Sequence, residues 1–296
     1  MQGHNFLREQ LDSIERQTHT SWLIWASDDS ADHKTQAILT DYQKRFGPVQ
    51  LSVCRGPARG FVANFLSLVC NDSIQADYFA FADQDDVWEA DKLERAVQWL
   101  QTVPAQVPAL YCGRTRKVDE NNQDLGFSPL FTRPPGFANA LVQSIASGNT
   151  MVFNQAARRL LQVAGAGLPV AAHDWWTYLL VTGAGGQVFY DPVPAVRYRQ
   201  HADNLIGTKG HWRKRLAHAH VLLRGSFRNW NEINIAALQT MRLHLTAENQ
   251  DRLDDFSKAH NGGLSARFAA SRRAGIYRQT WIGNLGLMAA LVLRRI

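Results

Sequence analysis

Short apolar runs alternate with amphipathic helical segments over the first hundred residues of the chain. Strands are expected at residues 22–26, 49–53 and 78–82, and helices at 6–17, 34–46, 61–70 and 91–100. Strands separated by helices favour a mostly parallel sheet that is covered by helices on both faces. The sequence therefore predicts an α/β fold.

The second half of the chain changes character. Further strands are expected at 110–118, 150–153 and 188–190, and a short helix at 175–181, whereas the pattern after about residue 205 is wholly helical. The 296 residues suffice for one large domain or a domain with an appendage. We expect an α/β domain over residues 1–205 and a basic helical extension over residues 206–296.

Three carboxylates follow the apolar run at 78–82 almost directly. Asp83, Asp85 and Asp86 would lie at the carboxyl edge of a buried strand, where open α/β sheets bind ligands. Carboxylates this close repel one another unless a cation neutralises them, and their hard oxygens suit Mg²⁺ or Mn²⁺. The alternative is an acidic surface turn that caps the next helix. The preceding strand favours the metal site.

The positive charge of the protein is concentrated in its C-terminal third. From Asn204 onward there are 15 Lys/Arg and five Asp/Glu, a balance of +10, so residues 1–203 carry −4 of the net +6. A basic, partly apolar tail suits an anionic surface, although solvated helix faces would look the same. No nucleic-acid recognition motif is present. A membrane surface is therefore the expected partner.

No stretch of the sequence is long enough for a transmembrane helix. The apolar segment 281–293 contains Asn284 and precedes two arginines, so it could lie in a membrane interface or dock on the core. The three cysteines show no metal-binding or redox spacing, and no signal peptide is visible. We expect a cytoplasmic protein, located peripherally at the inner face of the membrane.

Five motifs in the same order resemble family 2 glycosyltransferases, in particular bacterial rhamnosyltransferase-like members. They are the first helix FLREQLDSIERQT (6–18), the acidic loop SDDSAD (27–32), the DxD-type segment DQDDVWEADKL (83–93), HDWW (173–176) and YRQHADN (198–204). The resemblance covers residues 3 to about 207. It implies a GT-A fold, a nucleotide-sugar donor linked to dTDP or UDP, a divalent metal and inversion at the anomeric carbon.

The resemblance also implies roles for individual residues. Asp28 would contact the nucleobase and Asp83 the ribose. Asp85 and His201 would bind Mn²⁺ or Mg²⁺, which bridges the donor diphosphate. Asp174 would be the general base, although on spacing alone it could equally be a helix N-cap. Further expected donor-binding residues are Asp29 and Asp86.

Other candidates come from residue chemistry. Arg199 could clamp a diphosphate with its forked guanidinium, and Arg59 is a weaker candidate of the same kind. Gly148 and Asn149 could line the sugar pocket or form a tight turn. The remaining candidates are large rings or ring neighbours that could contact a sugar or lie in the core: Trp88, His173 and Trp175.

The implied activity is the transfer of a sugar, expected to be L-rhamnose from dTDP-rhamnose, to a glycan or lipid-linked acceptor during synthesis of surface polysaccharide such as O-antigen. Galactose, glucose and N-acetylated sugars stay open. A nucleotidyltransferase would require a glycine-rich phosphate loop near the N-terminus, and none is found. Family members begin with a strand that residues 1–5 are too short to supply, so a truncated or degenerate transferase with only a binding role is the other alternative.

Overall fold

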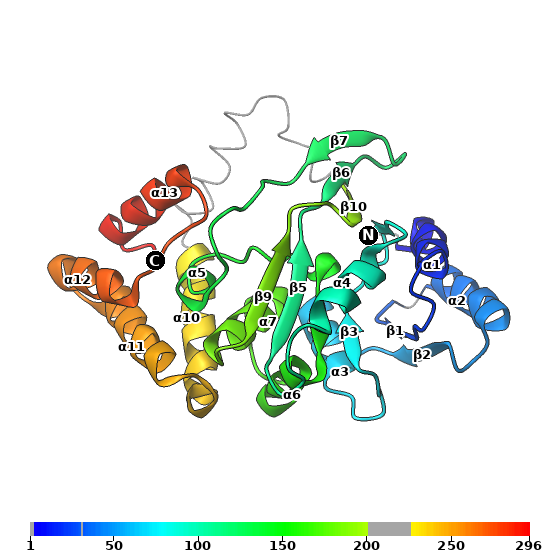
Figure 1. Cartoon of the computed structure of the whole chain (residues 1–296), viewed down its shortest axis with the longest axis horizontal. Coiled ribbons are helices and arrows are strands. Elements are labelled where there is room, and N and C mark those ends of the chain that lie inside the picture. The colour runs from blue at the N-terminus through cyan, green and yellow to red at the C-terminus, as the bar shows by residue number, and fades with distance from the viewer. Residues whose placement is uncertain (1–2, 31, 201–225) are drawn as a thin grey trace.

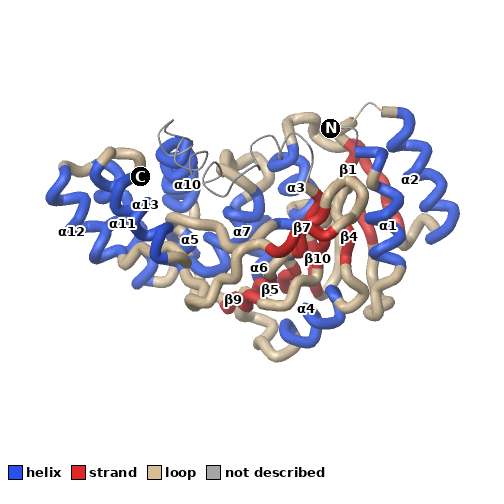
Figure 2. Tube along the Cα trace, turned by 90° about the horizontal axis from the view of Figure 1, so that it is seen from above, coloured by secondary structure: helices blue, strands red, loops and turns tan. Residues whose placement is uncertain are grey.

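The computed structural model describes residues 3–30, 32–200 and 226–296. Figure 1 shows strands in the middle of the molecule, with α1 (Leu7–Glu15) and α2 (His33–Phe46) at one end and the C-terminal helices at the other. The view from above in Figure 2 shows the same order along the long axis. The α/β class predicted from the alternating pattern is confirmed.

The remaining elements follow in chain order. The first group comprises η1 (Gly3–Asn5), β1 (Ile24–Asp28), β2 (Leu51–Arg55), α3 (Phe61–Val69), β3 (Tyr78–Ala80), β4 (Val87–Trp88) and α4 (Lys92–Leu100). The second comprises β5 (Ala109–Gly113), β6 (Arg116–Val118), β7 (Asp124–Phe127), α5 (Phe137–Ala140), η2 (Gly148–Thr150), β8 (Val152–Asn154), α6 (Gln155–Ala164), α7 (His173–Gly183), β9 (Gln187–Asp191) and β10 (Val196–Arg199). The last comprises α10 (Ser226–Thr240), η3 (Arg242–His244), α11 (Ala247–Asn261), α12 (Leu264–Ala274) and α13 (Trp281–Val292).

The strands form three sheets, of which the two four-stranded ones are mixed in direction. Their orders are β1-β2, β3-β8-β5-β9 and β4-β10-β6-β7. Among the described residues the pairings β1–β2, β5–β9 and β6–β10 are parallel, and the other four are antiparallel. The expectation of a mostly parallel sheet is therefore wrong in this respect.

The predicted strand at 110–118 is two strands in different sheets. β5 ends at Gly113, and the backbone N–H of Arg114 then donates to the Asp191 carbonyl (2.9 Å) while the N–H of Thr115 donates to Ser128 Oγ (3.0 Å). These bonds turn the chain out of one sheet, and β6 begins in the next. An apolar run alone does not reveal such a turn.

The N-terminal strands stand somewhat apart from the rest. In the described chain, β1 pairs with β2 and has no ladder with β3, and all five of its residues are only partly buried. β3 is likewise half-exposed and ends at Ala80, two residues earlier than predicted. The apolar run before the carboxylates is thus an edge strand rather than a fully buried one.

The C-terminal helices pack on the α/β body through α7. Phe227, Leu238 and Met241 belong to the same buried cluster as Trp176 of α7. At the end of α7, a Cβ on Gly183 would come within 2.7 Å of Leu245 Cδ2, so the close approach requires glycine. The expected boundary at 205/206 lies outside the described residues. None of the helices in the described part of the chain is long and apolar enough to cross a bilayer.

Candidate active site

The acidic loop between β3 and β4 is anchored by its last carboxylate. Asp86 is fully buried, and its side chain accepts hydrogen bonds from the Arg199 backbone N–H (3.1 Å) and from the side-chain amide of Asn149. Burial, with the nearby charge of Asp83, raises the pKa of Asp86 to about 8. As placed, this predicted donor-binding residue points into the protein and fixes the loop.

The other two carboxylates of the loop share their surroundings with Asp174. The pKa of Asp83 is raised to about 7, first by burial and then by the negative charges of Asp85 and Asp174. The structure therefore brings Asp174 to Asp83 and Asp85, although it lies about ninety residues away from them in the sequence. The cluster has an excess of negative charge that a bound cation would relieve.

Asp174 lies in the first turn of α7 and is oriented by backbone groups. Its Oδ2 accepts a hydrogen bond from the Gly148 N–H (3.1 Å), and its Oδ1 accepts one from the Trp175 N–H (2.7 Å). A Cβ on Gly148 would lie 2.8 Å from Nε2 of His173, so only glycine allows this approach. The N-cap interpretation does not hold, because the N-cap residue is Ala172.

The short helix η2 connects the acidic loop with Asp174. Gly148 donates to Asp174, and the next residue, Asn149, donates to Asp86. All three residues of η2 are buried. Gly148 and Asn149 thus fix the position of Asp174 relative to Asp86. Both residues were expected to line a sugar pocket, but as placed they hold the two carboxylates.

The three predicted ring contacts to sugar are buried. His173 is 5% exposed and stacks on Phe65 with ring centroids 4.1 Å apart. Burial lowers the His173 pKa to about 4, so the ring is neutral at pH 7. Trp175 is 8% exposed and donates its indole N–H to the Ala140 carbonyl (2.6 Å), and Trp88 is 6% exposed. As placed, none of these rings is open to a sugar. They are core residues, which was the alternative to sugar contact.

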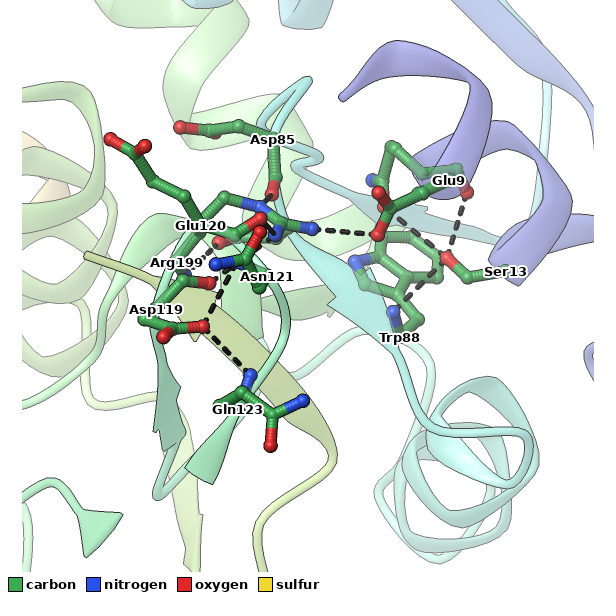
Figure 3. Close-up of polar contacts among 11 residues, drawn as sticks. Glu9, Ser13, Asp85, Trp88, Asp119, Glu120, Asn121, Gln123 and Arg199 are labelled. Carbon is green, nitrogen blue, oxygen red and sulfur yellow. Dashed lines mark hydrogen bonds and ion pairs between the residues drawn. The ribbon is translucent and has the colours of Figure 1, made fainter. Parts of the chain in front are cut away.

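Arg199 binds protein groups on three sides (Figure 3). Its side chain is 0% exposed. Nε donates to the backbone carbonyl of Asp85 (2.9 Å), Nη1 donates to the carbonyls of Asp119 (3.3 Å) and Glu120 (2.7 Å), and Nη2 pairs with Glu9 Oε2 (2.8 Å). These contacts tie the acidic loop to the β6–β7 turn and to α1. A direct contact with a diphosphate would require this guanidinium to leave its partners.

Two residues next to the loop were not predicted as part of the site. Burial, followed by the charges of Asp86, Asp83, Asp85 and Asp174 in that order, raises the pKa of Tyr198. Lys92 is fully buried with Nζ 3.5 Å from the Trp88 ring centroid, and burial lowers its pKa to about 7. Tyr198 lies in the 198–204 motif and Lys92 in the 83–93 motif, and this position in the sequence could have identified them as neighbours of the site.

The residues expected to hold the nucleotide lie after β1 and β2. Asp28 Oδ1 accepts hydrogen bonds from the backbone N–H (2.8 Å) and hydroxyl (2.6 Å) of Ser30. Asp29 Oδ1 accepts from the Ala58 N–H (2.8 Å) and joins the two loops, and Arg59 is exposed. One oxygen of Asp28 and one oxygen of Asp29 therefore serve these loops, whereas Arg59 stays exposed.

Helix α3 links this nucleotide side with the carboxylate side. The Asn64 amide donates to the Ser27 carbonyl at the end of β1 (3.1 Å). The next residue, Phe65, stacks on His173 beside Asp174. A single rigid helix thus spaces Asp28 from the proposed base.

Of the two residues expected to bind the metal, the structure describes only Asp85. His201 lies outside the described residues, and no group of three or more His, Cys, Asp or Glu side chains in the described ranges could hold an ion. A Mg²⁺-type site needs only one or two carboxylates when substrate phosphates and waters complete the shell. The carboxylate oxygens of Asp85 are of the kind that such an ion binds, and the neighbouring Asp83 and Asp174 add negative charge that the ion would offset.

Residues 3–160 match the family described as Glycosyl transferase family 2. The chain belongs to glycosyltransferase family 2. It is 26% identical over 215 residues to "dTDP-rhamnosyl transferase RfbG" of Shigella flexneri, covering 69% of this chain and 72% of that protein. It is 31% identical over 101 residues to "Putative teichuronic acid biosynthesis glycosyltransferase TuaG" of Bacillus subtilis (strain 168), covering 33% of this chain and 38% of that one. The expected family is confirmed.

Two solved structures share the fold. The S. aureus TarS 1–349 structure aligns with a TM-score of 0.52 and 13% identity, over 92% of this chain and 86% of that chain. The structure of GalNAc-T7 with UDP, GalNAc and Mn²⁺ aligns with a TM-score of 0.53 and 9% identity, over 93% of this chain and 53% of that chain. The GT-A fold inferred from the motifs is confirmed.

Proposed function

We propose that this family 2 glycosyltransferase is an inverting, metal-dependent enzyme that transfers L-rhamnose from dTDP-rhamnose to a glycan or lipid-linked acceptor in bacterial surface polysaccharide synthesis. The similarity to a dTDP-rhamnosyl transferase over most of both chains supports the donor. The observation that carries the chemistry is the bracing by η2, which fixes Asp174 beside the acidic loop. Residues 1–205 would be the catalytic domain and residues 206–296 a helical extension.

Asp174 is the proposed general base. An acceptor hydroxyl is a weak nucleophile, so a positioned carboxylate that takes its proton lowers the barrier. The N–H groups of Gly148 and Trp175 each bind one oxygen of Asp174 and hold the carboxylate in one orientation. The acceptor oxygen would attack the anomeric carbon from the side opposite the leaving diphosphate, and the configuration would be inverted.

Mn²⁺ or Mg²⁺ is the proposed cofactor, with Asp85 and His201 as its ligands. When bound, the ion would neutralise charge on the diphosphate as the sugar leaves. The raised pKa of Asp83 supports the assignment, because an added positive charge would restore its ionised form. The Mn²⁺ named with GalNAc-T7 agrees with this choice of ion.

The donor would lie between the two loops that α3 connects. Asp28 is proposed to contact the base, Asp83 the ribose, and Arg59 the phosphates from its exposed position after β2. Arg199 would act indirectly, by holding the Asp85 backbone in place. The acceptor is proposed to be lipid-linked and met at the inner face of the cytoplasmic membrane.

Nucleotide release from defined donors tests the proposal. The purified chain is incubated with Mn²⁺ and, in separate reactions, dTDP-rhamnose, UDP-glucose or UDP-galactose, and free nucleotide is measured during slow transfer to water. Release of dTDP that stops on removal of Mn²⁺ is the expected result. Faster release of UDP than of dTDP would contradict the donor assignment, and metal-independent release would contradict the cofactor.

A further inference from the structure

One face of the last helix is apolar and exposed. On α13 the side chains of Trp281, Leu285, Met288 and Val292 follow at spacings of four, three and four residues, so they share one face. They are 73%, 59%, 47% and 53% exposed, and Ile282 beside them is 45% exposed. Single exposed apolar residues are ordinary, but a continuous stripe of this size marks an interaction surface.

The opposite face of α13 is firmly packed. Leu287, Ala290 and Leu291 are buried. Arg267 of α12 is buried as well, and it donates hydrogen bonds to the backbone carbonyls of Leu291 (2.5 Å) and Gly262 (2.7 Å). The buried face of α13 is therefore held on α12, and the stripe on the other face is left exposed.

The chain segment around this stripe is basic. Residues 264–296 contain six arginines and no aspartate or glutamate; of these, Arg267 is buried and Arg273 pairs with Asp255 of α11. Arg272 at the end of α12 and Arg294 after α13 are both exposed. Within α13 the single polar side chain, Asn284, is used internally, because it accepts from the Arg278 N–H (2.8 Å) and donates to the Thr280 carbonyl (2.8 Å). Nothing on the stripe itself opposes transfer into an apolar phase.

We infer that the exposed face of α13 docks on an anionic lipid bilayer. At about 1.5 Å per residue the helix is about 18 Å long, too short for a hydrocarbon core of about 30 Å. An apolar stripe with flanking arginines suits a helix that lies in the interface plane, where apolar burial and attraction to anionic headgroups add. The inference rests on the proposed function in one respect: a lipid-linked acceptor would be met at this same surface.

Hydrogen bonds connect α13 to the helix that carries the proposed base. In the connector before α13, Gln279 exchanges two hydrogen bonds with the Arg133 backbone (both 3.0 Å). Asn139 donates to the connector backbone (3.0 Å) and accepts from the Tyr178 hydroxyl (3.0 Å). Tyr178 is one turn beyond Asp174 on α7. A docked α13 would thus hold Asp174 at a fixed height above the lipid surface.

The position of α13 agrees with this arrangement. In Figure 1 it lies at the upper edge of the molecule, on the same side as β6 and β7, whose connecting turn contacts the acidic loop through Arg199. A second copy of the chain is a poorer occupant of the stripe. Symmetric pairing would place two arginine-rich surfaces against each other and would be opposed by their repulsion.

Vesicle flotation tests the inference directly. The full chain is mixed with phosphatidylcholine vesicles that contain or lack phosphatidylglycerol, and the bound fraction is measured. We expect binding to the anionic vesicles and at least about tenfold weaker binding to the neutral ones. The double variant Leu285→Glu with Met288→Glu should lose at least about tenfold on the anionic vesicles, since two charges would enter the apolar layer.

Leu243→Glu is the matched control, because Leu243 is an apolar residue of the same C-terminal part, 92% exposed, but on η3. It should bind anionic vesicles as the unaltered chain does. Absence of vesicle binding, or equal loss in the control, would overturn the inference. A dimer in light scattering that only the α13 variant dissociates would assign the stripe to a second copy. Nucleotide binding, measured separately, distinguishes these results from failure of the proposed function.

Discussion

Replacing Arg199 by lysine should weaken both the fold and the donor site. The guanidinium makes four side-chain hydrogen bonds, to the carbonyls of Asp85, Asp119 and Glu120 and to Glu9. A lysine ammonium is one compact donor group without the guanidinium fork, so it cannot reach partners on three sides. At least two of these bonds should be lost, and buried carbonyls would be left without donors.

The size of the effect follows from the number and kind of bonds lost. Each lost bond to a charged donor costs about 1.5–3 kcal/mol, so the loss of two should lower the free energy of unfolding by about 3–6 kcal/mol. Released from Arg199, the Asp85 backbone would be less ordered, and we expect dTDP binding with Mn²⁺ to weaken at least about tenfold, or about 1.4 kcal/mol. Urea unfolding and calorimetric titration measure the two quantities.

Glu9→Gln is the control for this prediction. The Glu9 side chain is 49% exposed, and an exposed partner of an ion pair contributes under about 1 kcal/mol. This variant should keep nearly all its stability and its nucleotide affinity. The reasoning is refuted if Arg199→Lys is as stable as the unaltered chain, or if Glu9→Gln costs as much as Arg199→Lys.

Three further predictions concern the carboxylate cluster and its supports. Asp174→Asn should retain dTDP binding in calorimetry yet slow sugar transfer at least about a hundredfold, because only the base is removed; full activity would exclude Asp174. Asn149→Ala should lower the free energy of unfolding in urea by about 1–3 kcal/mol, because the buried Asp86 loses the hydrogen bond from the Asn149 amide. Gln143→Ala changes a half-buried amide that contacts the connector before α13, and it should leave nucleotide affinity unchanged. The pKa of His173 in the folded protein is about 4, below its ordinary value of 6.5. The neutral ring therefore contributes stability above pH 6.5 that is lost as the pH falls toward 4. In urea unfolding this loss should reach about 3 kcal/mol, and it should be absent in His173→Gln. Equal pH slopes in the two proteins would contradict the burial of a neutral ring.

The sequence predicted local structure better than long-range contacts. Helical spacing of apolar residues located α1, α2, α3 and α4 to within two residues of their bounds. The strands at β1 and β2 each begin two residues later than predicted, because Trp22 and Val49 have apolar side chains but no ladder partners. The direction of strand pairing was the larger error, because an apolar run has the same pattern in a parallel and in an antiparallel strand.

The site was predicted by residue type but not by orientation. The motif order selected Asp83, Asp85 and Asp174, and in the structure the charges of Asp85 and Asp174 act on Asp83. Arg199 looked like a phosphate ligand because its chemistry suits one. Its actual partners lie 79 to 190 residues away in the sequence, and no local pattern reveals them. Trp88 was ambiguous for the same reason, because a ring's neighbours decide whether it is core or surface.

Calorimetric titration of the purified chain with dTDP and with UDP, each with and without Mn²⁺, is the most direct test of the central claim. We predict that dTDP binds only when Mn²⁺ is present, that UDP binds more weakly, and that Asp85→Ala abolishes the metal-dependent part of the binding. Equal binding of dTDP with and without Mn²⁺, or unchanged binding by Asp85→Ala, would contradict a metal-dependent nucleotide-sugar site at the acidic loop.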